Sequence, residues 1–400
     1  MRKKLSPTLL ALTASIYISQ YLGVAFVMAA ASAILRQDGV SLDKLALLNL
    51  VALPLFGKIF YAPLIDRYRL VFQGQYRSWL LCAQLLMTLT LVLVGLLDFK
   101  QQLPLIVALF VVYAFATAMQ DVAIDGLACK IFSAEQRRYA NSIQFAGNSL
   151  GMIIGGGVLL MTYPWLGWRA SLWVLAGLTA LSWGQLLFFR ESEQSATTVT
   201  QGVRALLSDC KAFIGANRRW FGLLLCYPLA MSGAFALLNP MLVDAKWALQ
   251  DIGFAVRIYG SVIGLLSALS ASYFIGKWGR VRTLSALTLA LALALGLMLP
   301  IAWGYTSAVW VYAAITAYFS VFTALLATFG TLIMDRAADT GRYATFFTLQ
   351  FSMISGLGFV YAGLSMAAAK FLGYGCVIIV GMVCAVLCAV MSVSYFKEKP

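Results

Sequence analysis

The sequence predicts an all-α polytopic membrane protein whose twelve transmembrane helices form two pseudo-symmetric six-helix bundles. Of its 400 residues, 62% are hydrophobic and only 11% are charged, whereas an average soluble chain is about 25% charged. Apolar stretches of roughly 20 residues, the length needed to cross a ~30 Å hydrocarbon core, recur along the whole chain. Short motifs also recur at offsets of 204 and 210 residues, which indicates an internal repeat.

Hydropathy and helix-breaking residues set the positions of the predicted spans. They fall at 8–33, 43–65, 78–97, 103–129, 138–163, 169–190, 219–243, 251–275, 283–303, 306–334, 342–368 and 372–395. The first span follows three basic residues, as a signal peptide would, but its length of about 25 residues predicts a membrane helix. We expect an N-terminal bundle at 1–190, a cytoplasmic linker at 191–218 and a C-terminal bundle at 219–400.

The two motif pairs lie at the same place in each predicted bundle. Arg-Tyr-Ala at 138–140, before span 5, returns at 342–344 before span 11, and each copy is followed by Gln-Phe, at 144–145 and 350–351. The loop after span 2 (65–69) is echoed by the loop after span 8 (275–280). Matched landmarks in a chain of twelve spans indicate two six-helix repeats related by an axis along the membrane normal.

The basic residues are distributed as in a membrane protein with both termini in the cytoplasm. With that orientation, 21 Lys and Arg lie on the cytoplasmic side and 7 on the other side, the bias of the positive-inside rule. The net charge of +14 is spread over short loops, which argues against nucleic-acid binding. The part of the linker at 203–213 has helical spacing of apolar residues and either lies on the membrane surface or acts as a plain tether.

Several classes of chemistry lack support in the sequence. It has no histidine, and its seven cysteines are scattered without ligand-like spacing, so we expect neither a metal nor a cofactor. No nucleotide-binding loop or nucleophile motif is present, so we expect a transporter driven by an ion gradient or by substrate concentration rather than an enzyme. Without histidine, proton coupling must use carboxylates.

Charged side chains inside predicted spans are the strongest functional signal. An ion at the bilayer centre costs roughly 2.5 to 3.5 kcal/mol, so such residues usually have partners and face a cavity. By the helical rise, Lys58 and Asp121 share a depth of ~12–13 Å from the cytoplasmic ends of spans 2 and 4. Asp121 and Asp125 project from one face, with Gln120 beside them, and their repulsion favours protonation of one carboxylate. We expect Lys58, Asp121 and Asp125 to bind substrate or proton; the alternative is a structural lock between the two spans.

Other polar and small side chains are open to two interpretations. Gln144 and Asn148, four residues apart in span 5, are either cavity hydrogen-bond donors or interhelical partners. Gly147, Gly151 and Gly155 form a small-residue stripe that favours close helix packing over binding.

Tyr17 and Tyr21 in span 1, with Gln20 between them, either stack on a flat substrate ring or pack against neighbouring helices. In the second half, Gln350 is the matching candidate, and no Lys–Asp pair recurs at the membrane centre. The remaining polar points there are Asn239, Asp244 and Arg257.

The segment 62–67, Ala-Pro-Leu-Ile-Asp-Arg, with Arg69 resembles the loop 2–3 signature of the major facilitator superfamily. In that superfamily an Asp–Arg pair latches the two halves together at the cytoplasmic side. The resemblance implies a gating role for Asp66, Arg67 and Arg69, although the usual first glycine of the motif is replaced by Ala62.

Two longer stretches, 58–68 and 120–126, look like those of the AmpG-type muropeptide permeases, the acetyl-CoA transporters and their siderophore-uptake relatives. The resemblance is strong over most of the first half and weak over the second, and it implies that Lys58, Asp121 and Asp125 matter for transport. The compact length and the segments 28–30 and 39–41 look closer to the rhizobactin and pyochelin importers.

These resemblances imply an importer of an iron-siderophore, or a similar small polar metabolite, in the bacterial inner membrane, and the buried carboxylates Asp121 and Asp125 with Lys58 indicate that it is proton-coupled. We expect a monomer whose partners are its substrate, protons and the lipid bilayer. The alternatives are a muropeptide permease, an efflux pump working by proton antiport and, outside transport, a membrane sensor or assembly protein.

Overall fold

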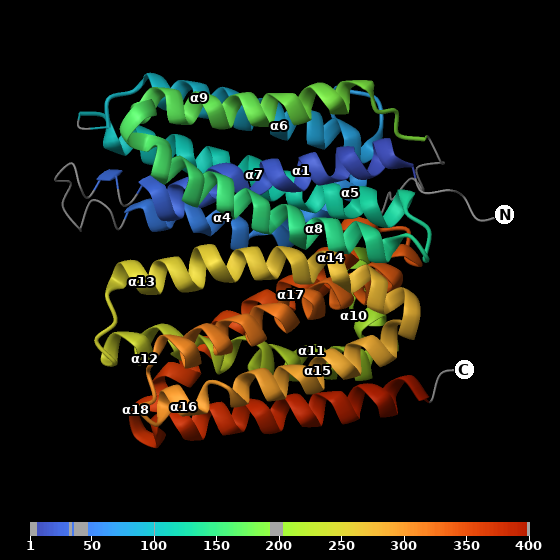
Figure 1. The fold of residues 1–400 in the computed structure, drawn as a ribbon. Helices are drawn as coiled ribbons and strands as arrows, with labels where there is room; N and C mark the ends of the chain where they lie inside the picture. The colour runs from blue at the N-terminus through green and yellow to red at the C-terminus, as the bar shows by residue number, and fades with distance from the viewer. Residues whose placement is uncertain (1–5, 32–33, 36–46, 100, 193–202, 398–400) are drawn as a thin grey trace. The chain divides into compact units, whose positions relative to one another are not determined.

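The computed structural model describes residues 6–31, 34–35, 47–99, 101–192 and 203–397, and this part of the chain is helical (Figure 1). Nine helices in these ranges are long and apolar enough to cross a membrane. Two of them, Arg137–Phe188 and Tyr343–Tyr395, are double, because Gly167 and Gly373 interrupt them with positive φ angles of 67° and 79°. Counting both double helices as pairs, and adding the broken span at 47–67, gives the twelve predicted spans.

The described chain divides into two compact units. Unit 1 contains residues up to 200 together with Met334–Thr348, and unit 2 contains the rest. The helices that precede the linker are α1 (Pro7–Ala25), η1 (Phe26–Ala31), η2 (Leu47–Ala52), α4 (Leu53–Phe56), α5 (Lys58–Arg67), α6 (Gln75–Leu96), α7 (Leu103–Ile131), α8 (Arg137–Met152), η3 (Ile153–Val158) and α9 (Leu159–Phe188).

The second half of the chain begins with the linker helix α10 and ends with the long double helix α18. Its helices are α10 (Val203–Ala216), α11 (Arg218–Pro228), η4 (Leu229–Gly233), η5 (Phe235–Leu237), α12 (Leu238–Asp244), α13 (Leu249–Gly253), η6 (Phe254–Tyr259), α14 (Gly260–Trp278), α15 (Arg280–Gly296), α16 (Leu299–Ala302), α17 (Ala308–Ala338) and α18 (Tyr343–Lys397).

Backbone landmarks repeat between the two halves. Gly74 and Gly279, 205 residues apart, both precede a span with positive φ (89° and 78°), a conformation that glycine adopts at no steric cost. Gly167 and Gly373, 206 residues apart, both lie between the last two spans of a half. The π-helical segments η1 and η4 start 203 residues apart in spans 1 and 7. These pairs are features of a two-fold repeat and belong to the predicted fold class.

Span 2 differs from the continuous helix that the sequence predicts. It consists of the 3-10 helix η2, the single turn α4 and the helix α5, with a turn at Gly57 between the last two. Pro54 lacks a backbone N–H, so a regular helix cannot bond through it, and its carbonyl accepts a hydrogen bond from the Tyr61 hydroxyl. The break places Lys58 at the first position of α5.

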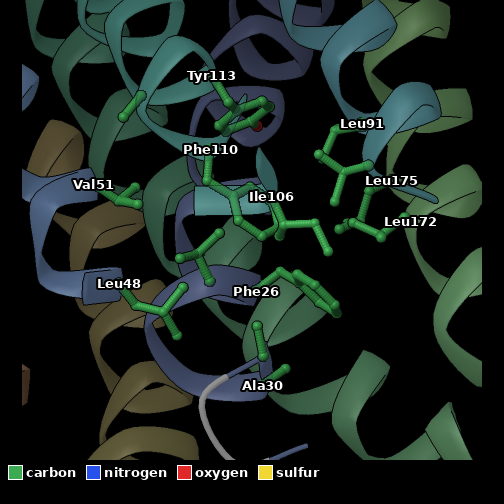
Figure 2. Packing of buried hydrophobic residues seen from close by; sticks show 14 of the residues in the cluster. Phe26, Ala30, Leu48, Val51, Leu91, Ile106, Phe110, Tyr113, Leu172 and Leu175 are labelled. Carbon is green, nitrogen blue, oxygen red and sulfur yellow. The ribbon is translucent and has the colours of Figure 1, made fainter. Parts of the chain in front are cut away.

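Two hydrophobic clusters fill unit 1, one toward each end of the bundle. One cluster, part of which is shown in Figure 2, includes Phe26, Leu91, Ile106 and Leu172 and lies near the start of α7. The other lies near the end of α7 and includes Leu12, Leu80, Leu127 and Leu186. Between these levels the helices carry buried polar side chains: Gln20 on α1, Gln84 on α6, and Gln120 and Asp121 on α7. The polar layer is therefore enclosed by apolar packing on both sides.

Candidate solute and proton site

An ion pair joins the broken span 2 to α7. Lys58 Nζ lies 2.6 Å from Asp121 Oδ2, and the side chains are 16% and 12% exposed. The other carboxylate oxygen, Oδ1, accepts a hydrogen bond of 2.6 Å from Gln20 Nε2 on α1. Both oxygens of Asp121 are thus engaged, one by a full positive charge and one by an amide, and bonds to an ionised carboxylate are the short and strong ones.

Asp125 lies one helical turn further along α7 and is only 2% exposed. Its Oδ1 accepts hydrogen bonds from the Tyr17 hydroxyl at 2.9 Å and from Gln144 Nε2 at 3.0 Å. Both donors are uncharged. An ionised Asp125 would therefore receive hydrogen bonds from uncharged donors only, whereas Lys58 is bonded to Asp121.

Close packing of α1 on α8 brings these donors to the carboxylates. The glycine stripe predicted in span 5 lies against α1: a Cβ at Gly147 would come within 2.9 Å of Tyr17 Cβ, and one at Gly151 within 2.8 Å of the Ile18 carbonyl oxygen. On α1, Tyr17 and Gln20 are three residues apart and so share a face. That face reaches Asp125 and Asp121, which are four residues apart on α7.

A second set of polar side chains, which we call the seam, consists of Gln120, Gln84, Ser19 and Ser182 and bonds separately from the two carboxylates. Gln120 Nε2 donates to the Ile16 carbonyl at 2.8 Å and lies 3.3 Å from Ser19 Oγ, instead of pointing to the acidic pair beside it in the sequence. Gln84 Nε2 donates to Ser19 Oγ at 3.3 Å and to Ser182 Oγ at 2.9 Å. These bonds link α1, α6, α7 and α9 through the polar layer.

Four buried glutamines of this region use their N–H groups and leave their carbonyl oxygens without a donor among the described residues. These are Gln20, Gln84, Gln120 and Gln144. The donors of Gln20 and Gln144 face carboxylate oxygens, which fixes the amide orientation, since turning either amide over would set oxygen against oxygen. The polar layer therefore offers spare hydrogen-bond acceptors beside the two carboxylates.

The remaining residues predicted to bind solute or proton fall into different surroundings. Asn148 is half-buried, and its Oδ1 accepts no hydrogen bond from the described residues. Tyr21 is partly exposed one turn beyond Tyr17, where its Cβ faces Gly151. Gln350 belongs to unit 2, where its Oε1 accepts a 2.7 Å bond from Trp220 Nε1.

Asp66 binds the start of α18, which belongs to unit 1 by its contacts. Its Oδ2 accepts bonds from the Thr345 backbone N–H at 2.7 Å and hydroxyl at 2.6 Å, and its Oδ1 accepts from the Ala344 N–H at 3.0 Å and the Tyr76 hydroxyl at 2.6 Å. The first N–H groups of a helix lack intrahelical partners and favour an anion, so Asp66 acts as a cap from another helix.

The two arginines of the predicted gating motif lie outside this contact. Arg67 and Arg69 are both exposed, and the Arg67 guanidinium sits 5.1 Å from the centre of the Tyr68 ring. Of the two segments that resemble the siderophore importers, 39–41 lies outside the described residues, and the side chains at 28 and 29 in the other are not described.

Some polar contacts were not predicted from the sequence. Gln20 was noted only as lying between two tyrosines, although its amide binds Asp121. Glu191, assigned to the linker, has a fully buried side chain that lies 2.7 Å from Lys130 Nζ and accepts a 2.9 Å bond from the Arg77 N–H. The available signal was a carboxylate directly after the apolar stretch of span 6, next to Arg190.

Comparison with known families decides the class of protein. The Major Facilitator Superfamily profile matches residues 13–362 of the chain. The chain belongs to this superfamily. The described residues contain nine helices that are long and apolar enough to cross a membrane, as in a multi-pass membrane protein of this superfamily, and the sequence is similar to that of an anhydromuropeptide permease.

The alignments with curated relatives cover only part of each protein. The chain is 29% identical over 243 residues to the anhydromuropeptide permease of Escherichia coli K12, an alignment that covers 60% of this chain and 49% of the permease. It is 22% identical over 267 residues to a putative transporter AmpG 4 of Rickettsia felis, covering 62% and 63%. The chain thus spans about half the length of the E. coli relative.

Solved structures share the fold at low sequence identity. The human organic anion transporter MFSD10 matches with a TM-score of 0.73 at 13% identity, covering 97% of this chain and 100% of that one. A bacterial homologue of the iron transporter ferroportin gives 0.68 at 16%, covering 98% and 100%, and the E. coli fucose:proton symporter gives 0.70 at 12%, covering 98% of each chain. These likenesses concern the fold alone.

Proposed function

We propose that the chain is a proton-coupled secondary transporter that carries a small polar solute across the bacterial inner membrane, with both termini in the cytoplasm. One observation supports this most directly: two carboxylates one turn apart have unlike partners, a lysine for Asp121 and neutral donors for Asp125. In this scheme Asp121 stays ionised with Lys58, and Asp125 takes up and releases the proton.

The charge arithmetic favours this division of roles. With Asp125 protonated, the cluster of Lys58, Asp121 and Asp125 is neutral, and with Asp125 ionised it carries one uncompensated negative charge. Burying an unpaired charge costs far more than burying a hydrogen-bonded neutral group. Proton loss thus makes the enclosed cluster unfavourable unless the site opens to water or gains a compensating group from the solute, which is how protonation can be linked to a conformational step.

Uptake driven by an imposed pH gradient in proteoliposomes tests the coupling. We expect Asp125→Asn to abolish the dependence on the gradient while retaining exchange of labelled solute across the membrane. Asp121→Asn should impair both, because it removes the charged partner of the ion pair that joins span 2 to α7. Normal gradient-dependent accumulation in both variants would end the proton-carrier proposal.

Two solute classes follow from different observations. The resemblance of the segments 28–30 and 39–41 to siderophore importers supports a ferric siderophore, and the match to an anhydromuropeptide permease supports a muropeptide-like solute. We take siderophore import as the first candidate and muropeptide import as the second. Thermal stabilisation of the purified protein by ferric siderophores or by anhydromuropeptides separates them, since only the bound class raises the midpoint.

A further inference from the structure

The linker helix α10 is joined to a membrane span by a single residue. It covers Val203–Ala216, Asn217 follows, and α11 begins at Arg218, the first residue of the span Arg218–Asp244. One residue spans at most ~3.6 Å. The end of α10 is therefore held at the level where that span enters the membrane.

One face of α10 is packed and defines how the helix is turned. Leu206, Cys210 and Phe213 are half-buried, and their spacing of four and three residues puts them on one side. The Phe213 ring meets the Phe221 ring of α11 edge-on at 5.9 Å. This contact fixes which side of α10 remains for other partners.

Next to the packed face lies an exposed apolar edge, followed by a basic row. Leu207 and Ile214, seven residues apart, are 63% and 40% exposed. Arg204 and Lys211, also seven residues apart, are exposed as well. At ~100° per residue, from 3.6 residues per turn, each basic residue lies about 60° around the helix from its apolar neighbour. The order around the helix is packed face, exposed apolar edge and basic row.

We propose that α10 lies in the headgroup layer of the membrane and binds anionic phospholipids. Leu207 and Ile214 reach the boundary of the acyl chains, and Arg204 and Lys211 contact lipid phosphates. An interfacial helix is recognised by this arrangement of an apolar edge beside cationic side chains. The register of two exposed aliphatic side chains with two cations favours this position over a solvated tether, the alternative that the sequence leaves open.

The charge of the segment supports an anionic partner. Four basic residues and one acidic residue lie within 203–219: Arg204, Lys211, Arg218, Arg219 and Asp209. A basic residue close to an anionic leaflet strengthens binding by about fivefold, so two of them contribute roughly 25-fold. The inference rests on the predicted cytoplasmic position of the linker and does not depend on proton coupling.

Lipid retention by the intact protein tests the proposal. The purified full-length chain is titrated with phosphatidylglycerol or with phosphatidylcholine, and the bound lipids are counted by native mass spectrometry. The double variant Arg204→Gln/Lys211→Gln is compared with Lys277→Gln/Arg282→Gln, which removes two exposed basic residues from the end of α14 and the start of α15. We expect the α10 variant to bind phosphatidylglycerol at least about tenfold more weakly, and the control variant to bind as the wild type does.

A second variant separates charge from insertion. Leu207→Ser/Ile214→Ser keeps every charge, so its residual phosphatidylglycerol binding should weaken steeply with salt, whereas the charge variant should retain only salt-insensitive binding. The proposal would be overturned if the wild type and the α10 charge variant bound phosphatidylglycerol equally well, or if the control variant lost as much binding as the α10 charge variant. Gradient-driven uptake in the α10 variants should keep its dependence on Asp125. The two proposals can therefore fail separately: lipid binding by α10 can be absent while proton coupling is present, and proton coupling can be absent while α10 binds lipid.

Discussion

Unit 1 and unit 2 place different chemistry at corresponding positions of the same repeat. In unit 1 a buried acid receives two hydrogen bonds from neutral donors on two other helices. At offsets of 203 to 206 residues, the acid and its two donors correspond to a phenylalanine, a tryptophan and a glutamine of unit 2. The pairs are Asp125 with Phe329, Tyr17 with Trp220, and Gln144 with Gln350.

In unit 2 the counterparts satisfy one another. Trp220 Nε1 donates to Gln350 Oε1 at 2.7 Å, and the Phe329 ring packs 5.9 Å from the Trp220 ring. All three are buried completely. In unit 1, both side chains donate hydrogen bonds to a carboxylate. In unit 2, the side chains at the same two positions bond each other, one as donor and one as acceptor, beside an apolar ring.

The comparison shows what converts a packing position into a candidate ion site. Helix positions and the flanking glutamine are shared, so the backbone does not decide the difference. The difference lies in one buried acid with two hydrogen-bond donors, and in a lysine that the helix break places at the start of α5. We infer that unit 1 carries the ionic chemistry, and four predictions test this difference between the units.

The largest effect is expected when the missing acid is placed in unit 2. Phe329→Asp puts a carboxylate into a fully buried site beside Trp220 and Tyr227, whose polar groups already bond Gln350 and Ser392. An unpaired buried charge together with the lost ring should cost at least about 3 to 5 kcal/mol, enough to prevent folding. Phe329→Leu, the control, should fold. Normal yield and thermal stability of Phe329→Asp would mean that the two sites differ less than the hydrogen bonds indicate.

Removing the lysine of unit 1 should come next in size. Lys58→Met leaves Asp121 with only the Gln20 amide, and breaking one side of a buried pair costs about 3 to 5 kcal/mol, less here because both side chains are slightly exposed. The double variant Lys58→Met/Asp121→Leu removes both charges and should regain stability without regaining transport. Unfolding midpoints and uptake measured on the same preparations check this; recovery of uptake in the double variant would favour the structural lock over the solute site.

The two matched glutamines should separate stability from transport. Gln350→Leu strands the Trp220 N–H in a buried position, which should cost about 1 to 3 kcal/mol while leaving uptake unchanged. Gln144→Leu removes one of two donors to Asp125 and should lower gradient-driven uptake with a smaller loss of stability. The reverse pattern, transport lost with Gln350 and kept with Gln144, would place the functional amide in the second unit.

Much of the fold could be predicted from the sequence because lipid imposes simple rules. A span must be apolar for about 20 residues and must satisfy its backbone internally, so span positions and the repeat are visible as composition and spacing. The break in span 2 was not predicted, although Pro54 and Gly57 are both present in the predicted span. Hydropathy reports how apolar a segment is and does not depend on its backbone conformation. The 3-10 helix η2 is therefore indistinguishable from an α-helix in a hydropathy profile.

The candidate site could be predicted in its charges and not in its partners. Lys58 and Asp121 were paired by depth alone, and the structure brings them within 2.6 Å. Which amide faces which carboxylate depends on helix rotation, and a sequence fixes rotation only through packing. Gln120 illustrates this: it neighbours Asp121 in the sequence, yet consecutive helix positions face different directions, and its amide joins the seam with Ser19.

The smallest effect is expected from removing a single hydroxyl at the acid. Tyr17→Phe keeps the ring packed and deletes one of the two donors to Asp125, a change worth about 0.5 to 1.5 kcal/mol. If Asp125 ionises during each transport cycle, that deficit falls on the ionised form and should slow gradient-driven uptake by roughly three- to tenfold while exchange persists. Tyr227→Phe in unit 2 removes a buried hydroxyl that bonds Ser392 at 2.7 Å and should lower stability by a similar amount without affecting uptake. Equal uptake defects in the two variants would show that the tyrosines act through packing, and the ionic inequality of the units would then have no part in transport.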